Sequence, residues 1–272
     1  MVEGNTTRIM ICADDFGMSG AIDAGILELA GMGRLSATSC LAQGPAFAAS
    51  AKSLQVTCAA GIGFQAGLHL NFTESLGANG LYYPLPTLIL AAWSRRLDMS
   101  KVRSQIVYQI DLFEAGMGRA PDFIDGHQHV HQFPQIRTAL LEELDRRYGE
   151  QRPWLRSTRV GSMAGLPARL RLKAAVVDRL GSRALARAAH AAGYCMNRRF
   201  LGVYDFQGGV DGYATLLRAW LGNAAEGDLI MCHPASNGTT DVSLGAQRHA
   251  EYQVLSGPVG AELLQRYGIA LV

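Results

Sequence analysis

Three of the seven histidines of the chain, His127, His129 and His131, alternate within the segment DGHQHVHQFP of residues 125–134. The apolar residues before this segment favour a buried strand, and its final proline is typical of a helix start. Alternate residues of an extended segment point the same way, so we expect the three imidazoles and Asp125 to share one face. Imidazole is a common ligand of zinc-like ions, so the pattern indicates a metal or catalytic site. The alternative is a set of surface or hydrogen-bonded histidines.

Two adjacent carboxylates, Asp14 and Asp15, follow the apolar run RIMICA of residues 8–13, which is typical of a buried parallel strand. Buried carboxylates are costly unless they pair with cations or with a metal. Adjacent strand residues face opposite ways, so we expect one aspartate to bind a metal and the other to act on water. An alternative role is the N-cap of the next helix, but Ser19 suits that position well.

Further polar residues stand at other predicted strands. His69 lies near the end of residues 62–71, and His233 follows the apolar residues 228–232. Alone, His69 would more often be a core histidine, but beside the other clusters we favour a ligand. Arg156, within residues 154–160, is predicted to hold a catalytic aspartate ionised and oriented, or to form an exposed ion pair.

Strands and helices alternate along the chain without a linker-like change of composition or an internal repeat. We therefore predict one α/β-barrel domain over residues 1–272. Further strands are expected at residues 36–42, 123–124, 200–203 and 269–272, and helices at residues 19–31, 100–117, 134–149, 167–192, 211–223 and 243–256, with a short helix from Pro45. The long segment 72–98 has little regular pattern, and its aromatic residues, such as Tyr82, favour a lid or substrate wall, with a structural flap over the barrel edge as the equal alternative.

Composition excludes several classes of protein. A net charge of +2 over 272 residues gives no argument for nucleic acid, and the arginines of residues 137–199 are interpreted as solvated helix faces. The five cysteines lack C-x-x-C spacing and indicate a reducing compartment. We expect no membrane span and no signal peptide, and therefore a cytoplasmic location.

Together these residues could form a hydrolytic site. Asp15, His69 and one histidine of residues 127–131 make an Asp-His-His set, which leaves a zinc-type ion an open position. Such an ion lowers the pKa of bound water towards about 7 and polarises a carbonyl. Asp14 would be the general base and His233 would protonate a leaving amine, which suits amide or ester hydrolysis.

Four motifs resemble the YdjC-like carbohydrate deacetylases, which include chitooligosaccharide and hopanoid-biosynthesis deacetylases. The motifs are ADDFG at 13–17, GLHL at 67–70, DGHQHVHQFP at 125–134 and CHP at 232–234. They occur in the order of the family, and a helix with Arg248, Glu251, Tyr252 and Leu255 resembles its closing helix.

The resemblance implies an irregular (β/α) barrel of about seven strands, similar to glycoside hydrolases and deacetylases, and metal-dependent deacetylation of N-acetylated sugars. It implies Asp15, His69 and His127 as metal ligands, Asp14 as base and His233 as acid. His129 and His131 match further residues of the histidine motif. Together with Tyr82 and Arg248, they are predicted to contact the substrate, an acetylated amino-sugar saccharide or glycoconjugate. A homodimer is expected by the same analogy.

The metal and the reaction have alternatives. Histidine ligands favour zinc, whereas a carboxylate with waters also admits magnesium, manganese or nickel. A metal-dependent phosphoesterase or amidohydrolase with a non-sugar substrate would use similar ligands, but no glycine-rich phosphate loop is present. A non-catalytic sugar-binding protein is the third hypothesis, and it would have no need of a complete set of base, ligands and acid.

Overall fold

Short apolar runs form parallel strands in the computed structural model, which describes residues 6–61, 63–237 and 244–272. Each predicted strand overlaps an observed one, although residue 62 of the third strand and residue 243 of the last predicted helix lie outside the described residues. The strands are β1 Thr7–Phe16, β2 Ala37–Cys40, β3 Gln65–Leu70, β4 Phe123–Gly126, β5 Trp154–Leu155, β6 Phe200–Leu201, β7 Leu229–Cys232 and β8 Ile269–Leu271.

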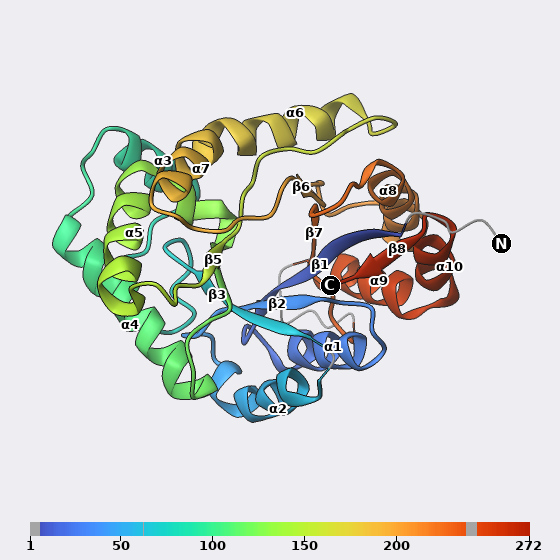
Figure 1. Cartoon of the computed structure of the whole chain (residues 1–272), viewed down its shortest axis with the longest axis horizontal. Helices are drawn as coiled ribbons and strands as arrows, with labels where there is room; N and C mark the ends of the chain where they lie inside the picture. Colours follow the sequence, from blue (N-terminus) through green and yellow to red (C-terminus); the bar gives the residue numbers. More distant parts are fainter. Residues whose placement is uncertain (1–5, 62, 238–243) are drawn as a thin grey trace.

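The strands form one parallel sheet that curls into an irregular barrel. Their order is β5-β4-β3-β2-β1-β7-β6, and β8 pairs with the start of β1. Isolated bridges join Leu155 to Met196 and Val160 to Phe200, so the segments after β5 and before β6 close the sheet. The predicted (β/α) barrel of about seven strands is therefore confirmed. Figure 1 shows the strands in the middle of the molecule with the helices around them.

Alternating side chains give the wall of the barrel two apolar faces. Cys12, Phe123, Phe200 and Met231 belong to a small buried cluster inside the barrel, whereas neighbours such as Ile11 pack in the larger core under the helices. Because the central strands β2, β3, β4 and β7 are buried on both faces, most of them read as largely apolar runs. The largest group of buried charged side chains lies where the strands end.

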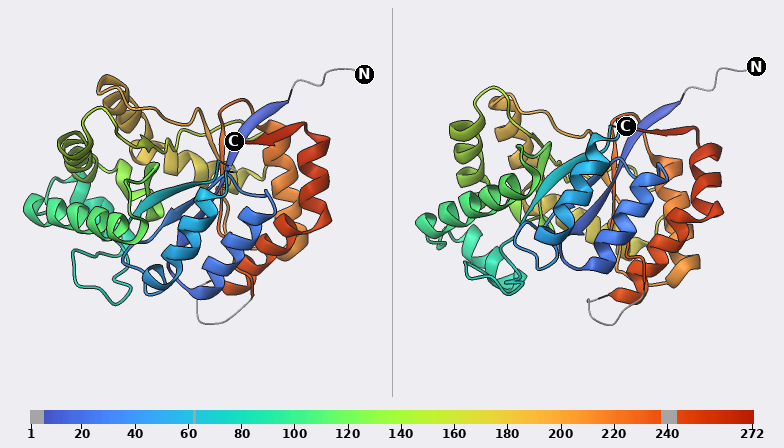
Figure 2. Two further views of the ribbon diagram at one scale, coloured as in Figure 1. Left: turned by 60° about the horizontal axis from the view of Figure 1, so that its bottom comes forward. Right: turned by 90° about the horizontal axis from the view of Figure 1, so that it is seen from below.

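The described part of the chain contains ten α-helices. The two views of Figure 2 show helices packed around the sheet. They are α1 Gly20–Gly31, α2 Phe47–Ala59, α3 Leu85–Trp93, α4 Met99–Met117, α5 Pro134–Tyr148, α6 Ala168–Val177, α7 Arg183–Ala191, α8 Gly209–Asn223, α9 Gly245–Ser256 and α10 Pro258–Arg266. A 3-10 helix, η1, spans His127–Gln132, and a π-helical turn, η2, spans Asp178–Ser182.

Several predicted elements differ from the observed ones. The segment 72–98 contains helix α3, and α10 was not predicted. The long helix predicted at 167–192 is broken by η2, where Gly181 has a φ of 140° and its backbone lies against Gln132. A Cβ atom on Gly181 would lie 2.3 Å from the Gln132 carbonyl oxygen, so this contact requires glycine. The strand predicted at 154–160 ends at Leu155.

Candidate active site

A bulge at the end of β1 brings two neighbouring carboxylates to one place. The register with β2 shifts between Ala13 and Phe16, and Asp15 has a left-handed φ of 72°. As a result, Asp14 Oδ2 lies 4.0 Å and Asp15 Oδ1 3.4 Å from the same atom, Nε2 of His69. The expectation that the two aspartates face opposite ways is wrong, because it assumed a regular strand.

His69 stands near the end of β3 between two carboxylates. Its Nδ1 donates a hydrogen bond of 2.6 Å to Asp125 Oδ1, and the Ser39 hydroxyl donates to the same oxygen. Burial alone would lower the pKa of His69, but Asp125 and Asp14 raise it to about 10. Asp125 therefore orients the imidazole so that Nε2 faces Asp15, an arrangement typical of metal-binding histidines and their supporting carboxylates.

His127, the first residue of η1, completes the group. Its Nδ1 lies 3.1 Å from Asp15 Oδ1, and its Nε2 lies 3.2 Å from Glu74 Oε1. Asp15, His69 and His127 each offer one ligand atom, and these atoms lie within 4.8 Å of one another. Two imidazoles and one carboxylate are a donor set that suits a catalytic zinc-type ion, so the residues present fit such a metal.

Two buried arginines, Arg156 and Arg248, each bind one of the two aspartates. Arg156 donates to both oxygens of Asp14, at 2.6 and 2.7 Å, and its Nη2 lies 2.5 Å from Asp125. Arg248 binds Asp15 through Oδ2, at 2.5 Å, which leaves Oδ1 for the histidines. Burial would raise the pKa of Asp15, but Arg248 and His127 hold it well below its usual range, so Asp15 is ionised.

His233 follows β7 and faces this group from the other side. Its Nε2 lies 4.0 Å from Asp14 Oδ2, and its ring packs edge-on against Phe206. The backbone N–H of His233 donates to Glu251 of α9 at 2.6 Å, and Tyr204 donates to the same carboxylate. Burial lowers the pKa of His233 to about 3, so its imidazole is neutral in this environment.

These side chains line one cavity at the carboxyl ends of the strands. Its volume is about 460 Å³, and its residues include Asp14, Asp15, His69, His127 and His233. One wall is apolar and comes from α3, α6, η2 and the segment after β6, with Leu85, Ile89, Val176, Leu180 and Phe206. The cavity therefore joins a charged floor to an apolar wall, as in sites for small organic ligands.

Comparisons with known proteins place the chain in a family. The model of the YdjC-like protein family matches residues 8–266. The chain belongs to the YdjC-like protein family. A carbohydrate deacetylase of Homo sapiens is 31% identical over 186 residues, which are 63% of this chain and 56% of the relative. A chitooligosaccharide deacetylase of Salmonella schwarzengrund is 29% identical over 136 residues, 47% of this chain and 52% of that protein. The matches thus span about half the length of these relatives.

Solved structures share the fold of this YdjC-like protein. A protein of Enterococcus faecalis V583, described as a cellobiose-phosphate cleavage protein, superposes with a TM-score of 0.68 at 21% identity, covering 98% of this chain and 97% of the other. The Bc1960 peptidoglycan N-acetylglucosamine deacetylase superposes with a TM-score of 0.53 at 13% identity, covering 98% and 86%. At these identities the likeness shows the barrel fold alone.

In this YdjC-like protein the histidine motif does not present one face. Gln128 and His129 have positive φ angles of 51° and 62°, so the chain coils into η1 instead of extending. His129 lines the cavity and packs edge-on against Phe200. His131 is fully buried behind the cavity wall, where its Nε2 donates to the Arg156 carbonyl oxygen at 3.0 Å. The predicted common face of three imidazoles is wrong, and His131 does not line the cavity.

Of the other two residues predicted to contact the substrate, Arg248 lines the cavity and Tyr82 does not. Arg248 lines the cavity while it pairs with Asp15. Tyr82 does not line it, because its ring lies beside Gly80 and Gln105. The segment 72–98 contributes to the site instead through Glu74 and helix α3.

Sequence reasoning missed Glu74 and Glu251 as members of the site. Glu74 stands in an irregular segment without any periodic signal, so its contact with His127 follows only from the folded path. Glu251 was noted as part of the closing helix, but nothing in its spacing pointed to the His233 backbone. Burial raises the pKa of Glu251 to about 7, against the hydrogen bonds from His233 and Tyr204.

Proposed function

We propose that this protein is a metal-dependent hydrolase that removes the N-acetyl group from N-acetylglucosamine-containing saccharides or glycoconjugates. The observation that carries the proposal is the joining of Asp14, His233 and the Asp15–His69–His127 group in one cavity. The names of the curated relatives, carbohydrate deacetylase and chitooligosaccharide deacetylase, support the same reaction.

Asp15, His69 and His127 would hold the divalent ion. Zinc suits this donor set best, and magnesium, manganese or nickel are the alternatives. When bound, the ion would act as a Lewis acid on the acetyl carbonyl and favour the deprotonation of water. Asp125 would keep the His69 ring in the tautomer that offers Nε2, because its carboxylate accepts the proton of Nδ1.

Asp14 would accept the proton of the attacking water. Arg156 fixes both oxygens of Asp14, so the carboxylate cannot rotate away from the cavity. His233 is neutral, so it must first take up the proton that it delivers to the leaving amine. The 4.0 Å between Asp14 Oδ2 and His233 Nε2 allows the proton to pass from base to acid after a small movement.

The apolar wall of the cavity suits the organic part of such a substrate. An acetyl methyl group and the apolar face of a sugar ring both gain from contact with side chains such as Leu85, Ile89 and Phe206. The cavity volume of about 460 Å³ is within the usual range for small-molecule sites, roughly 300–1,000 Å³.

A substrate panel tests this function. The zinc-loaded protein is incubated with N-acetylglucosamine mono-, di- and oligosaccharides and, in parallel, with phosphate monoesters and simple non-sugar amides. Acetate release from the acetylated sugars alone is the expected result. Turnover of phosphate esters or non-sugar amides without acetate release would favour the alternative hydrolase, and saturable sugar binding without any turnover would favour a binding protein.

A further inference from the structure

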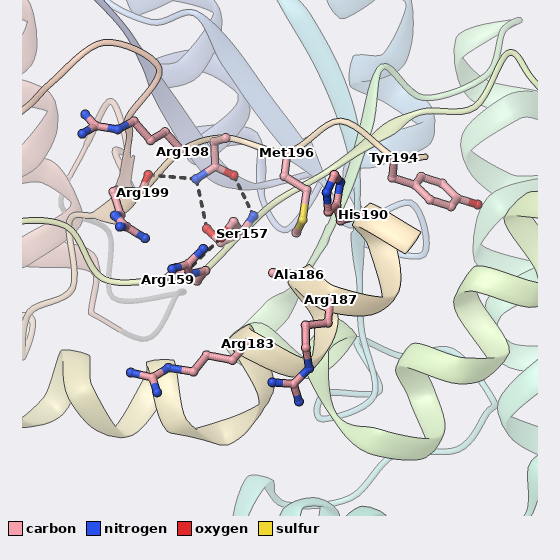
Figure 3. Close-up of a pocket in the computed structure, with 11 residues that line it drawn as sticks. Ser157, Arg159, Arg183, Ala186, Arg187, His190, Tyr194, Met196, Arg198 and Arg199 are labelled. Carbon is pink, nitrogen blue, oxygen red and sulfur yellow. Dashed lines mark hydrogen bonds between the residues drawn. The ribbon is translucent and has the colours of Figure 1, made fainter. Parts of the chain in front are cut away.

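A second cavity, outside the barrel, is lined by basic side chains. It has a volume of about 660 Å³, and Figure 3 shows its residues. Arg183 and Arg187 extend from helix α7 on one side, and the arginines of the facing segments lie on the other. The five arginines that line it are Arg159, Arg183, Arg187, Arg198 and Arg199. The sequence pattern indicates only solvated helix faces for the arginines of residues 137–199. It does not predict that five of them line one cavity.

The fold explains why these arginines meet. Arg156 and Phe200 point into the barrel, so their neighbours Ser157 and Arg199 stand on the opposite, outer side of the same wall. Helix α7 covers this outer side, and residues 183 and 187 are one turn apart and share a helix face. The two cavities have no lining residue in common.

The positive charge of this cavity has little internal compensation. Among residues 6–61, 63–237 and 244–272, no aspartate or glutamate lines it. Arg183 and Arg198 approach Asp178 and Asp228 only at 3.9 Å. Within the same described ranges, the side chains of Arg159 and Arg187 have no hydrogen-bond or ion-pair partner, whereas the charge of Arg199 acts on Asp228 and opposes the effect of burial on the pKa of that carboxyl.

The floor of the cavity is held in place by one amide side chain. Asn197 accepts a hydrogen bond from the Ser157 N–H at 2.6 Å and donates to the carbonyl oxygens of Ser157 and Arg199 at 3.0 and 2.9 Å (dashed lines in Figure 3). These bonds tie the segment after β5 to the segment before β6. The backbone that carries Arg159, Arg198 and Arg199 is therefore fixed before any ligand binds.

We propose that this cavity is a binding site for a small molecule with a phosphate or pyrophosphate group. Guanidinium groups match phosphate oxygens with paired hydrogen bonds, and a polyanion would relieve the mutual repulsion of the five cations. The cavity is larger than a phosphate, so it has room for an organic remainder beside Ala186, Met196 and Tyr194. The arginines gather in one hollow between α7 and the two facing segments, which favours a small ligand over a nucleic acid, because a nucleic acid would need an extended basic stripe.

Binding of inorganic pyrophosphate tests the site. The full chain is titrated calorimetrically at constant ionic strength, and the double variant Arg183→Gln/Arg187→Gln is compared with wild type. We expect saturable binding of one pyrophosphate per chain, and a Kd about tenfold or more weaker in the variant. The absence of saturable binding to the wild type would overturn the proposal.

A matched variant separates the site from general charge. Arg171→Gln/Arg218→Gln removes the same two charges from exposed positions on α6 and α8, and neither residue lines the cavity. We expect this variant to bind pyrophosphate within about twofold of wild type. An equal loss in both variants would overturn the proposal in favour of unspecific attraction.

Two further measurements do not depend on the folding of a variant. Pyrophosphate should protect Arg183 and Arg187, but not Arg171, from modification by an arginine-specific dicarbonyl reagent, as mapped by mass spectrometry. Equal protection of all three would contradict a local site.

A competition experiment identifies the source of the phosphate group. A short single-stranded oligonucleotide and anionic lipid vesicles each compete with pyrophosphate for the protein. Preferential binding of the oligonucleotide or of the vesicles would overturn a small-molecule site.

Discussion

Asp14 and Asp15 are neighbours in the chain, but their partners differ. Arg156 takes both oxygens of Asp14, whereas Arg248 takes only one oxygen of Asp15 and leaves the other facing His69 and His127. The proposed division into a fixed base and a ligand, which the strand pattern attributes to opposite faces, would thus have a different physical origin. It would arise from Arg156 and Arg248, two arginines that come from distant parts of the chain.

The role of Asp14 can be tested by Asp14→Asn. The amide keeps the size of the side chain but cannot accept a proton from water, so we expect acetate release to fall by about 10²-fold or more. Metal content, measured by elemental analysis, should remain at the wild-type level because Asp14 is outside the proposed ligand set. Undiminished acetate release would refute the assignment of Asp14 as base.

The supporting role of Asp125 can be tested by Asp125→Asn. The change weakens the hydrogen bond that orients His69, so we expect metal affinity to fall by about 10- to 100-fold in competition with a chromophoric chelator. Asp211→Asn, at an exposed position in the first turn of α8, is the matched control and should leave the affinity unchanged. Equal affinities in all three proteins would show that Asp125 does not support the metal.

At the scale of elements, strand ends were easier to predict than the coil that follows them. The apolar runs of β1, β3 and β7 clearly predict strands, and the polar residues at the ends of these strands can be read from the sequence. The path of η1 was not predictable, because Gln128 and His129 adopt positive φ without glycine. Helix α3 was missed because its prolines and aromatic neighbours resemble a loop, although Pro84 and Pro86 in fact flank its first residue.

The break between α6 and α7 gives a prediction for Gly181. Gly181→Ala would place a Cβ atom against the Gln132 carbonyl at a positive φ, so we expect the free energy of unfolding to fall by about 2 kcal/mol or more. Gly31→Ala is the control, because nothing lies within 4 Å of its added Cβ at the end of α1. Urea unfolding measures both, and equal effects would contradict the close-contact explanation.

The start of α1 gives a prediction about pH. Asp23 accepts a hydrogen bond of 2.6 Å from the Gly17 N–H, and burial raises its pKa from 3.8 to about 6. The folded protein therefore holds this proton more tightly than the unfolded chain, and Asp23 contributes stability below pH 4 that is lost as the pH rises through 6.

Comparison of wild type with Asp23→Asn isolates this contribution, because the amide does not titrate. The difference in unfolding free energy between the two proteins should shift in favour of the variant by up to about 2 kcal/mol between pH 4 and pH 7. Urea unfolding at a series of pH values measures it. A difference that is independent of pH would show that Asp23 titrates normally.

At the scale of the whole molecule, the barrel could be predicted because helices and strands alternate throughout. Its closure could not, since the isolated bridges join Leu155 of β5 to Met196 and Phe200 of β6 to Val160, and neither Met196 nor Val160 belongs to a strand. The same closure creates the basic cavity, whose arginines are scattered in the sequence. None of the described helices is both long and apolar enough to cross a membrane. The single domain over residues 1–272, the cytoplasmic location and the homodimer stay predictions.

The most direct test of the account is metal reconstitution of the whole protein. The chain is stripped with a chelator and supplied with zinc, magnesium, manganese or nickel, and acetate release from N-acetylglucosamine oligosaccharides is measured. We predict no release without metal, and release that saturates at one equivalent of the preferred ion. Acetate release that is equal with and without added metal would contradict the proposed metal-dependent deacetylase activity.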